Sequence, residues 1–179
     1  MTRRQNAAFA VLATMLLLAL AGCGFHLRNA LLLPQELGPL QVDPNDPHSE
    51  LASELELALG RAGAVIVPMG TPSAEGEHAT LRIIGERWGN TPISIDQFGR
   101  SQEFTLRYAV IFNLENADGS ELVPKQAIEL ARDYVSVPTR SIGTEGEREI
   151  LAREMRREMV TSILRRIDAV SRLAQERAP

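Results

Sequence analysis

The chain has 179 residues, of which 44% are hydrophobic and 4% aromatic, and its formal net charge at pH 7 is −4. This composition is typical of a globular protein and excludes a largely disordered chain. The negative net charge argues against nucleic-acid binding, which needs a concentrated basic surface. With a single cysteine, an internal disulfide and a zinc site built from several cysteines are both excluded.

Residues 1–22 have the pattern of an export signal. Arg3 and Arg4 lie in a short polar start, and Ala7–Leu20 is almost entirely apolar before the small residues that precede Cys23. A charged region, an apolar region and a small-residue cleavage site are typical of a secretory signal. The apolar run is shorter than the roughly 20 residues that a membrane-spanning helix needs, although an N-terminal anchor helix is the alternative. We predict removal of residues 1–22 and export by the general secretory pathway.

Leu20-Ala21-Gly22-Cys23 resembles the lipobox of bacterial lipoproteins. The thiol of Cys23 can take an S-diacylglycerol group, and the new N-terminus can be acylated, which gives three chains in lipoproteins of this kind. Each buried methylene contributes about 0.8 kcal/mol, so three chains should hold the protein on a membrane. The mature chain, residues 23–179, then has 17 basic and 23 acidic residues. Its length predicts a single lipid-anchored domain.

The first predicted strand, Leu37–Val42, is followed by a helix with both ends marked. Asp46-Pro47 offers an N-cap acceptor and a proline at the first helical position. Gly63 lies where a left-handed residue commonly ends a helix. The apolar stripe between these signals keeps helical spacing and consists of Leu51, Leu55, Ala58, Leu59 and Ala62.

Three shorter extended segments come next. We predict strands at residues 64–67, 80–88 and 91–97, separated by a loop and a break. In the second segment, the residues expected to share one face are Leu81, Ile83 and Gly85. Phe98-Gly99-Arg100 predicts a turn after the third segment.

Glu103–Glu115 is the clearest strand of the chain, because apolar side chains alternate with polar or small ones along its whole length. Asp118-Gly119 predicts a hairpin turn, after which Glu121–Val137 returns as the partner strand with a bend near Pro124. Arg107 and Arg132 lie within these two strands, where cross-strand ion pairs are the expected role.

A long amphipathic helix ends the chain. Thr144 and Glu147 have the spacing of a capping box, which predicts the start of this helix at Thr144. The apolar stripe then continues at steps of three and four through Ala152, Met155, Met159, Ile163, Ile167, Val170 and Ala174. The charged residues on the other faces are interpreted as solvated. The two methionines are interpreted as core residues, with a ligand-binding surface as the alternative.

The order of these elements predicts an α+β fold. Hairpins require antiparallel pairing, and the helices on either side of the strands should both cover one face of the sheet. We therefore predict a two-layer sandwich, with two helices packed on one face of a mainly antiparallel sheet of about four strands.

No motif predicts catalysis. The histidines, His26, His48 and His78, are isolated in sequence, and no paired metal-ligand spacing lies near them. Nucleophile-elbow, phosphate-loop and Ser-x-x-Lys motifs are missing. Function has to be argued from a site, so we expect no enzyme, no metal and no cofactor, although a pair of distant carboxylates remains an alternative.

The start of the mature chain, Cys23-Gly24-Phe25-His26-Leu27-Arg28, closely resembles that of the LPS-assembly lipoprotein family, LptE. The similarity covers most of the mature chain, thinly in the loops, and includes Pro34, Asp46-Pro47, Leu55–Gly63, Gly99, Glu103-Phe104 and Glu149–Met155. The family fold, two helices against a four-stranded sheet, is the one that the pattern predicts. Gly24 is compatible with sorting to the cell outer membrane.

The resemblance implies an outer-membrane lipoprotein that sits as a plug inside the barrel of the LPS-assembly protein LptD. It implies assistance in barrel assembly, binding of lipopolysaccharide and its delivery to the cell surface. The alternatives are an unrelated outer-membrane lipoprotein with a structural or interaction role and a periplasmic enzyme.

Arg100 and Arg140 are the candidate lipopolysaccharide-binding residues. The family uses basic residues in these two neighbourhoods, but its positions would align with Gln97 and Thr144, so the resemblance carries over to regions. A guanidinium can hold a phosphate through two hydrogen bonds. The alternative for both arginines is a solvated loop charge.

Overall fold

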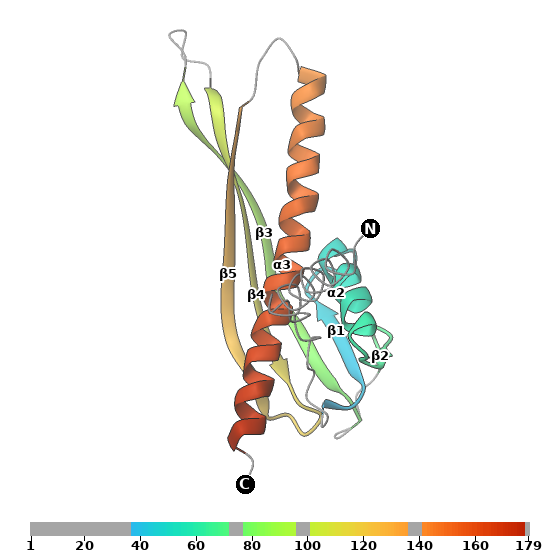
Figure 1. The fold of residues 1–179 in the computed structure, drawn as a ribbon. Coiled ribbons are helices and arrows are strands. Elements are labelled where there is room, and N and C mark those ends of the chain that lie inside the picture. Colours follow the sequence, from blue (N-terminus) through green and yellow to red (C-terminus); the bar gives the residue numbers. More distant parts are fainter. Residues whose placement is uncertain (1–36, 72–76, 96–100, 136–140, 178–179) are drawn as a thin grey trace, which may run out of the picture. The chain divides into compact units, whose positions relative to one another are not determined.

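Five strands form one mixed sheet, and two helices cover one of its faces (Figure 1). The computed structural model describes residues 37–71, 77–95, 101–135 and 141–177, all of which belong to one compact unit, Leu31–Pro179. The strands are β1 (Leu40–Pro44), β2 (Ile66–Val67), β3 (Ala79–Ile95), β4 (Ser101–Glu115) and β5 (Glu121–Val135), and the helices are α2 (Glu50–Arg61) and α3 (Ser141–Arg177).

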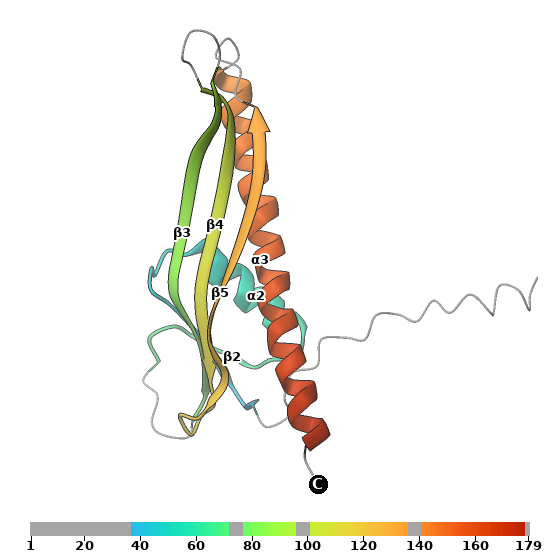
Figure 2. The same cartoon turned by 90° about the vertical axis from the view of Figure 1, so that its left-hand side faces the viewer.

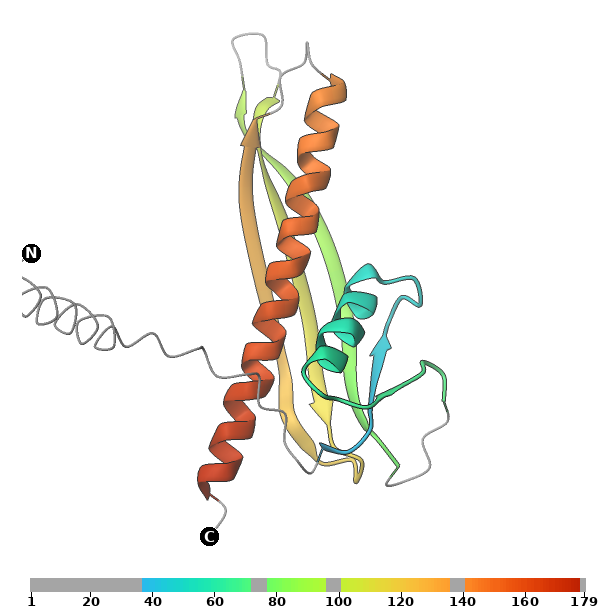
Figure 3. The ribbon, with the colours of Figure 1, turned by 45° about the vertical axis from the view of Figure 1, so that its right-hand side comes forward.

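The strand order across the sheet is β2-β1-β3-β4-β5. β1 runs parallel to both β2 and β3, whereas β3, β4 and β5 pair antiparallel. Figure 2 shows the three long strands side by side with α3 along them, and Figure 3 shows both helices in front of the sheet. The predicted α+β sandwich is confirmed, with the two-residue β2 as its fifth strand.

α2 begins later than predicted. Its N-cap is Ser49, whose hydroxyl accepts a hydrogen bond from the backbone N–H of Ala52 at 3.1 Å. Asp46 instead accepts from the backbone N–H of His48 at 2.9 Å in the preceding turn, so the prediction of Asp46 as N-cap is wrong. At the other end, Gly63 follows the C-cap with φ 98°, the left-handed conformation that glycine adopts without strain.

β3 is one strand where the sequence predicted two. It pairs with β4 from Thr80 to Ile95 without a break, although the register shifts around Pro92. Proline is tolerated here because β1 pairs with β3 only as far as Ile83. Beyond that point β3 is an edge strand and needs no N–H donor on its open side.

A register shift between Ile83 and Gly85 changes which β3 residues face the helices. One extra residue in a strand reverses the alternation of side chains that follows it. Gly85 pairs with Ile111, on the outer face, so the prediction that it shares a face with Ile83 is wrong. Trp88 takes a helix-facing position instead, opposite Tyr108 of β4.

β4 and β5 follow the predicted hairpin. The alternation of β4 is confirmed, and the helix-facing side chains that are fully buried or nearly so are Leu106, Tyr108, Val110, Phe112 and Leu114. The turn contains Gly119 at φ 79°, and Asp118 accepts hydrogen bonds from the N–H and hydroxyl of Ser120. A register shift in the β4–β5 pairing lies beside Pro124. β5 extends as far as Val135, and the last two residues of the predicted strand, Ser136 and Val137, lie outside the described part of the chain.

α3 begins at Ser141, so the prediction that Thr144 is its N-cap is wrong. No proline lies between Pro138 and Thr144, and the chain can therefore become helical before Thr144. Farther along the helix, Met155 and Met159 are buried, which confirms that they are core residues.

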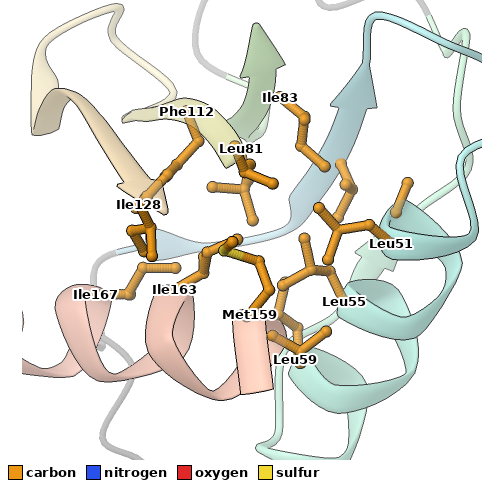
Figure 4. Packing of buried hydrophobic residues seen from close by; sticks show 14 of the residues in the cluster. Leu51, Leu55, Leu59, Leu81, Ile83, Phe112, Ile128, Met159, Ile163 and Ile167 are labelled. Atoms are coloured by element: carbon orange, nitrogen blue, oxygen red, sulfur yellow. The ribbon is translucent and has the colours of Figure 1, made fainter. Parts of the chain in front are cut away.

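The core lies where both helices meet the sheet (Figure 4). α2 contributes one row of leucines and α3 a row of isoleucines and Met159, and both rows pack on strand side chains. The residues of this contact are Leu51, Leu55, Leu59, Leu81, Ile83, Phe112, Ile128, Met159, Ile163 and Ile167. The outer face of the sheet is more polar, and there Arg107 forms the predicted cross-strand pair with Glu129 at 2.9 Å.

Arg132 does not form the predicted cross-strand pair. Its guanidinium meets Glu158 of α3 at 2.5 Å. Arg132 lies two residues from Leu130 and from Tyr134 on β5, so it projects to the helix side of the sheet, where α3 supplies the partner.

None of the described helices is both long enough and apolar enough to cross a membrane.

Candidate functional site

The three predicted site residues, Cys23, Arg100 and Arg140, lie outside the described residues. Their neighbours are described. Ile95 pairs with Ser101, and Glu103 pairs with Val135. The strand ends that flank residues 96–100 and 136–140 are therefore neighbours at one end of the sheet (Figure 1).

A cleft lies between the start of α2, the sheet and the N-terminal half of α3. It consists of three adjoining hollows with volumes of about 770, 280 and 360 Å³, all lined in part by Arg156. Ligand pockets commonly have volumes of about 300–1,000 Å³. The lining residues come from the end of β1 (Pro44), from the turn before α2 (Asn45, Asp46, Pro47, His48, Ser49), from α2 (Glu50, Ser53, Glu54), from β3 and β4 (Ile83, Glu86, Trp88, Leu106) and from α3 (Arg148, Glu149, Ala152, Arg153, Arg156, Arg157).

Arg156 is the centre of this cleft. Its side chain is only 14% exposed and bridges α3 to α2, with nitrogens 2.5 Å from Glu50 and 3.8 Å from Glu54. Its Nε is buried and has no hydrogen-bond partner among the described residues. Since buried donors are nearly always paired in folded proteins, this N–H is a candidate contact for a bound ligand.

Glu86 connects α2 to the sheet below the cleft. Its carboxylate accepts hydrogen bonds from the hydroxyl of Ser49 and from that of Tyr108, both at 2.7 Å. Ser49 therefore caps α2 and also fastens it to β3. Burial, followed by the hydrogen bond to Glu86 and its negative charge, raises the pKa of Tyr108 well above its ordinary range.

Tyr108→Phe should lower the free energy of unfolding by about 1–3 kcal/mol near neutral pH, because Glu86 loses a donor. The raised pKa means that the folded protein keeps this proton where the unfolded chain releases it, above a pH of about 10. The difference in the free energy of unfolding between the native protein and the variant should therefore be largest below that pH and should decrease as the pH rises further. Urea unfolding of both proteins at about pH 8 and about pH 11 measures the difference. An equal difference at the two pH values would contradict the assignment.

One face of α3 lines the cleft. Glu149, Ala152, Arg153, Arg156 and Arg157 are spaced three, four, seven and eight residues from the first, which places them on the same side of a helix. Arg153 and Arg157 are exposed. Neither forms an ion pair within the described part of the chain.

The opposite wall of the cleft is apolar and aromatic. Trp88 stacks on Tyr108 with ring centroids 3.8 Å apart and an angle of 10° between the rings. Leu106 of β4, in the same wall, is 3% exposed. The arrangement combines unpaired guanidinium groups with an apolar surface, which suits binding of an amphiphilic molecule.

Sequence reasoning missed this site because it assigned the charges of α3 to a solvated face. Two signals were present in the sequence. Arg153, Arg156 and Arg157 repeat at helical spacing, and Trp88 is the single tryptophan of the chain. The described ranges contain no group of three or more His, Cys, Asp or Glu that could hold a metal ion.

The family profile described as "LptE: Lipopolysaccharide-assembly" matches residues 37–167. The LPS-assembly lipoprotein LptE of Photorhabdus laumondii is 27% identical over 161 residues, covering 90% of this chain and 85% of that protein. The protein of the same name from Yersinia pestis is 29% identical over 150 residues, covering 84% and 70%.

Among solved structures, lipoprotein B from Nitrosomonas europaea has a TM-score of 0.68 at 25% identity, and the match covers 86% of this chain and 96% of that one. The matched family consists of assembly lipoproteins, which confirms the prediction of a non-enzymatic role. Because the profile spans most of the chain, the protein belongs to the LptE family of lipopolysaccharide-assembly proteins.

Proposed function

We propose that this protein is an outer-membrane lipoprotein that forms a plug-and-barrel complex with the LPS-assembly protein LptD. In this role it assists barrel assembly, binds lipopolysaccharide and helps to deliver it to the cell surface. Membership of the LptE family is the observation that carries the proposal. It is supported by the relatives named as LPS-assembly lipoproteins, which align over 84–90% of the chain.

The N-terminal sequence supports the membrane part of the proposal. Residues 1–22 act as a signal peptide that is removed, and residues 23–179 form the mature domain. Cys23 carries N-acyl and S-diacylglycerol groups. Gly24 follows the lipidated residue and is compatible with transfer to the outer membrane.

Co-purification tests the partner. The chain is tagged at its C-terminus, expressed from its own promoter in its host and extracted from envelopes with mild detergent. We expect an outer-membrane β-barrel in the eluate in a fixed ratio to the chain. An unrelated outer-membrane lipoprotein with the same tag is the control, and recovery of the chain as an isolated monomer would contradict the complex.

The same preparation tests whether Arg100 and Arg140 bind lipopolysaccharide. A guanidinium contact with a phosphate is a charge-assisted hydrogen bond, so Arg100→Glu with Arg140→Glu should weaken lipopolysaccharide binding at least about tenfold. The amount of barrel recovered should not change. Arg61→Glu with Arg165→Glu, at two exposed positions on α2 and α3, is the matched control. Unchanged binding in the loop variant would show that the assignment is wrong and leave the protein as a structural plug.

A further inference from the structure

The residues that line the cleft around Arg156 do not include Arg100 or Arg140. We infer that this cleft binds a phosphorylated amphiphile, with the phosphate on Arg153 and Arg157 and the acyl part against Trp88 and Leu106. This inference rests on the proposed function for the expectation that such a ligand reaches the protein. The ligand chemistry is argued from the cleft itself.

The two parts of the cleft join each other. The hollow beside Arg153 and Arg157 and the hollow beside Trp88 and Leu106 share Arg156 as a lining residue. They also share Glu149 and Ala152. A molecule with a charged head and an apolar tail could therefore contact both parts at once.

Total charge does not select the ligand, because the lining contains five carboxylates and four arginines. The contacts that these groups already make decide which of them are available to a ligand. Glu50 and Glu54 face Arg156, and Glu86 accepts two hydroxyl hydrogen bonds. Asp46 accepts a backbone N–H.

Three charged side chains of the lining, two positive and one negative, have neither an ion pair nor a side-chain hydrogen bond among the described residues. Arg153 and Arg157 have no ion pair with any described residue, and the opposing charge is Glu149. Two guanidinium groups one helical turn apart can hold the oxygens of one phosphate, a geometry that a lysine ammonium does not offer. The groups available to a ligand therefore favour an anion.

Burial supports a ligand that displaces water. The Nε of Arg156 is buried without a partner among the described residues, and an oxygen of a bound head group could accept from it. The hollow beside Trp88 has a volume of about 360 Å³. Three of its six lining residues are apolar, Trp88, Leu106 and Ala152. This apolar part of the wall suits part of an acyl chain, because burial of each methylene contributes about 0.8 kcal/mol.

The fluorescence of Trp88 tests the inference directly, because the chain contains a single tryptophan. The full chain, purified from membranes in detergent, is titrated with lipid A that carries its phosphates. The same titration is made with dephosphorylated lipid A and with phosphatidylglycerol. We expect a saturable change in fluorescence with phosphorylated lipid A. The affinity for the dephosphorylated form should be at least about tenfold lower. A comparable response to phosphatidylglycerol supports the site and identifies a phospholipid head group as a source of its ligand.

Arg153→Ala with Arg157→Ala should raise the apparent Kd for phosphorylated lipid A about tenfold or more. Both residues are exposed, so the thermal midpoint should be unchanged. Arg61→Ala with Arg165→Ala removes the same charge from exposed positions outside the cleft and should leave the Kd unchanged. The inference is wrong if Trp88 does not respond, if both variants bind alike, or if removal of the phosphates has no effect.

The outcome is distinguishable from that of the proposed function. Arg100→Glu with Arg140→Glu should leave the response of Trp88 unchanged, because those residues belong to the loops. If the barrel co-purifies but the fluorescence of Trp88 does not change, the family role is supported and the inference about the cleft is wrong. A response of Trp88 without a barrel partner supports the cleft and overturns the complex.

Discussion

Cys23→Ala is expected to abolish covalent lipid attachment, and with it the stable association of the mature domain with membranes. The physical reason is the size of the hydrophobic contribution. At about 0.8 kcal/mol for each methylene, even ten buried methylenes contribute about 8 kcal/mol. The remainder of the attachment would depend on contacts between the domain and a partner.

Mass spectrometry of protein from its own host measures this effect. The native chain should begin at Cys23 and carry the mass of three acyl chains, and the variant should carry none. Gly24→Ala changes the adjacent residue but keeps the thiol, so it should remain acylated. Residues 24–179 exported behind an ordinary cleavable leader should appear in the soluble fraction of a strain that lacks the barrel. An unmodified sulfur or an intact leader on the native chain would contradict the assignment.

Leu55→Ala is expected to lower the free energy of unfolding by about 2–5 kcal/mol, the usual range for a leucine removed from a well-packed core. Leu55 is 0% exposed and lies on the face of α2 that packs on the core (Figure 4). The substitution removes apolar contacts and leaves a cavity at the junction of both helices with the sheet. A loss of this size is a large fraction of the total free energy of unfolding of an ordinary domain.

Leu57→Ala is the matched control for this prediction. It makes the same chemical change two residues away on α2, at a side chain that is 61% exposed. Its effect should stay within about 0.5 kcal/mol, as for most surface substitutions. Urea unfolding of both variants measures the comparison, with an unchanged m-value as a sign of an unchanged unfolding transition. Similar losses for the two variants would show that α2 does not pack as described.

The α2 substitution should also affect the cleft. Glu50 and Glu54, which face Arg156, lie on the same helix as Leu55. If α2 shifts when its core contact is lost, these carboxylates move with it. A change in Trp88 fluorescence in Leu55→Ala, and not in Leu57→Ala, would report this coupling.

Local sequence patterns predicted the elements that depend on near neighbours. The alternation along β4 needs only residues two apart, and the apolar stripe of α3 needs only residues three and four apart. Gly63 was predicted correctly as the left-handed residue of a helix end, and Asp118-Gly119 was predicted correctly as a hairpin turn. In each case the physical constraint acts within a few residues, so the sequence contains it directly.

Contacts between distant segments decided the rest. One extra residue in β3 turned Gly85 outward and Trp88 inward, and no local pattern marks that insertion. The bond between Arg132 and Glu158 joins residues 26 positions apart, so its partner becomes visible only when α3 lies on β5.

The sequence by itself determined the types of the main elements and the α+β class, and it predicts an export signal and a lipidation site in a part of the chain outside the described residues. The tertiary structure decided the continuity of β3, the start of α2 at Ser49 and the cleft around Arg156. Ser49 precedes α2, and Glu86, Tyr108 and Arg156 come from β3, β4 and α3. Their meeting depends on strand register and helix packing, which are set by the burial of the whole core and cannot be calculated from the neighbours of any one residue.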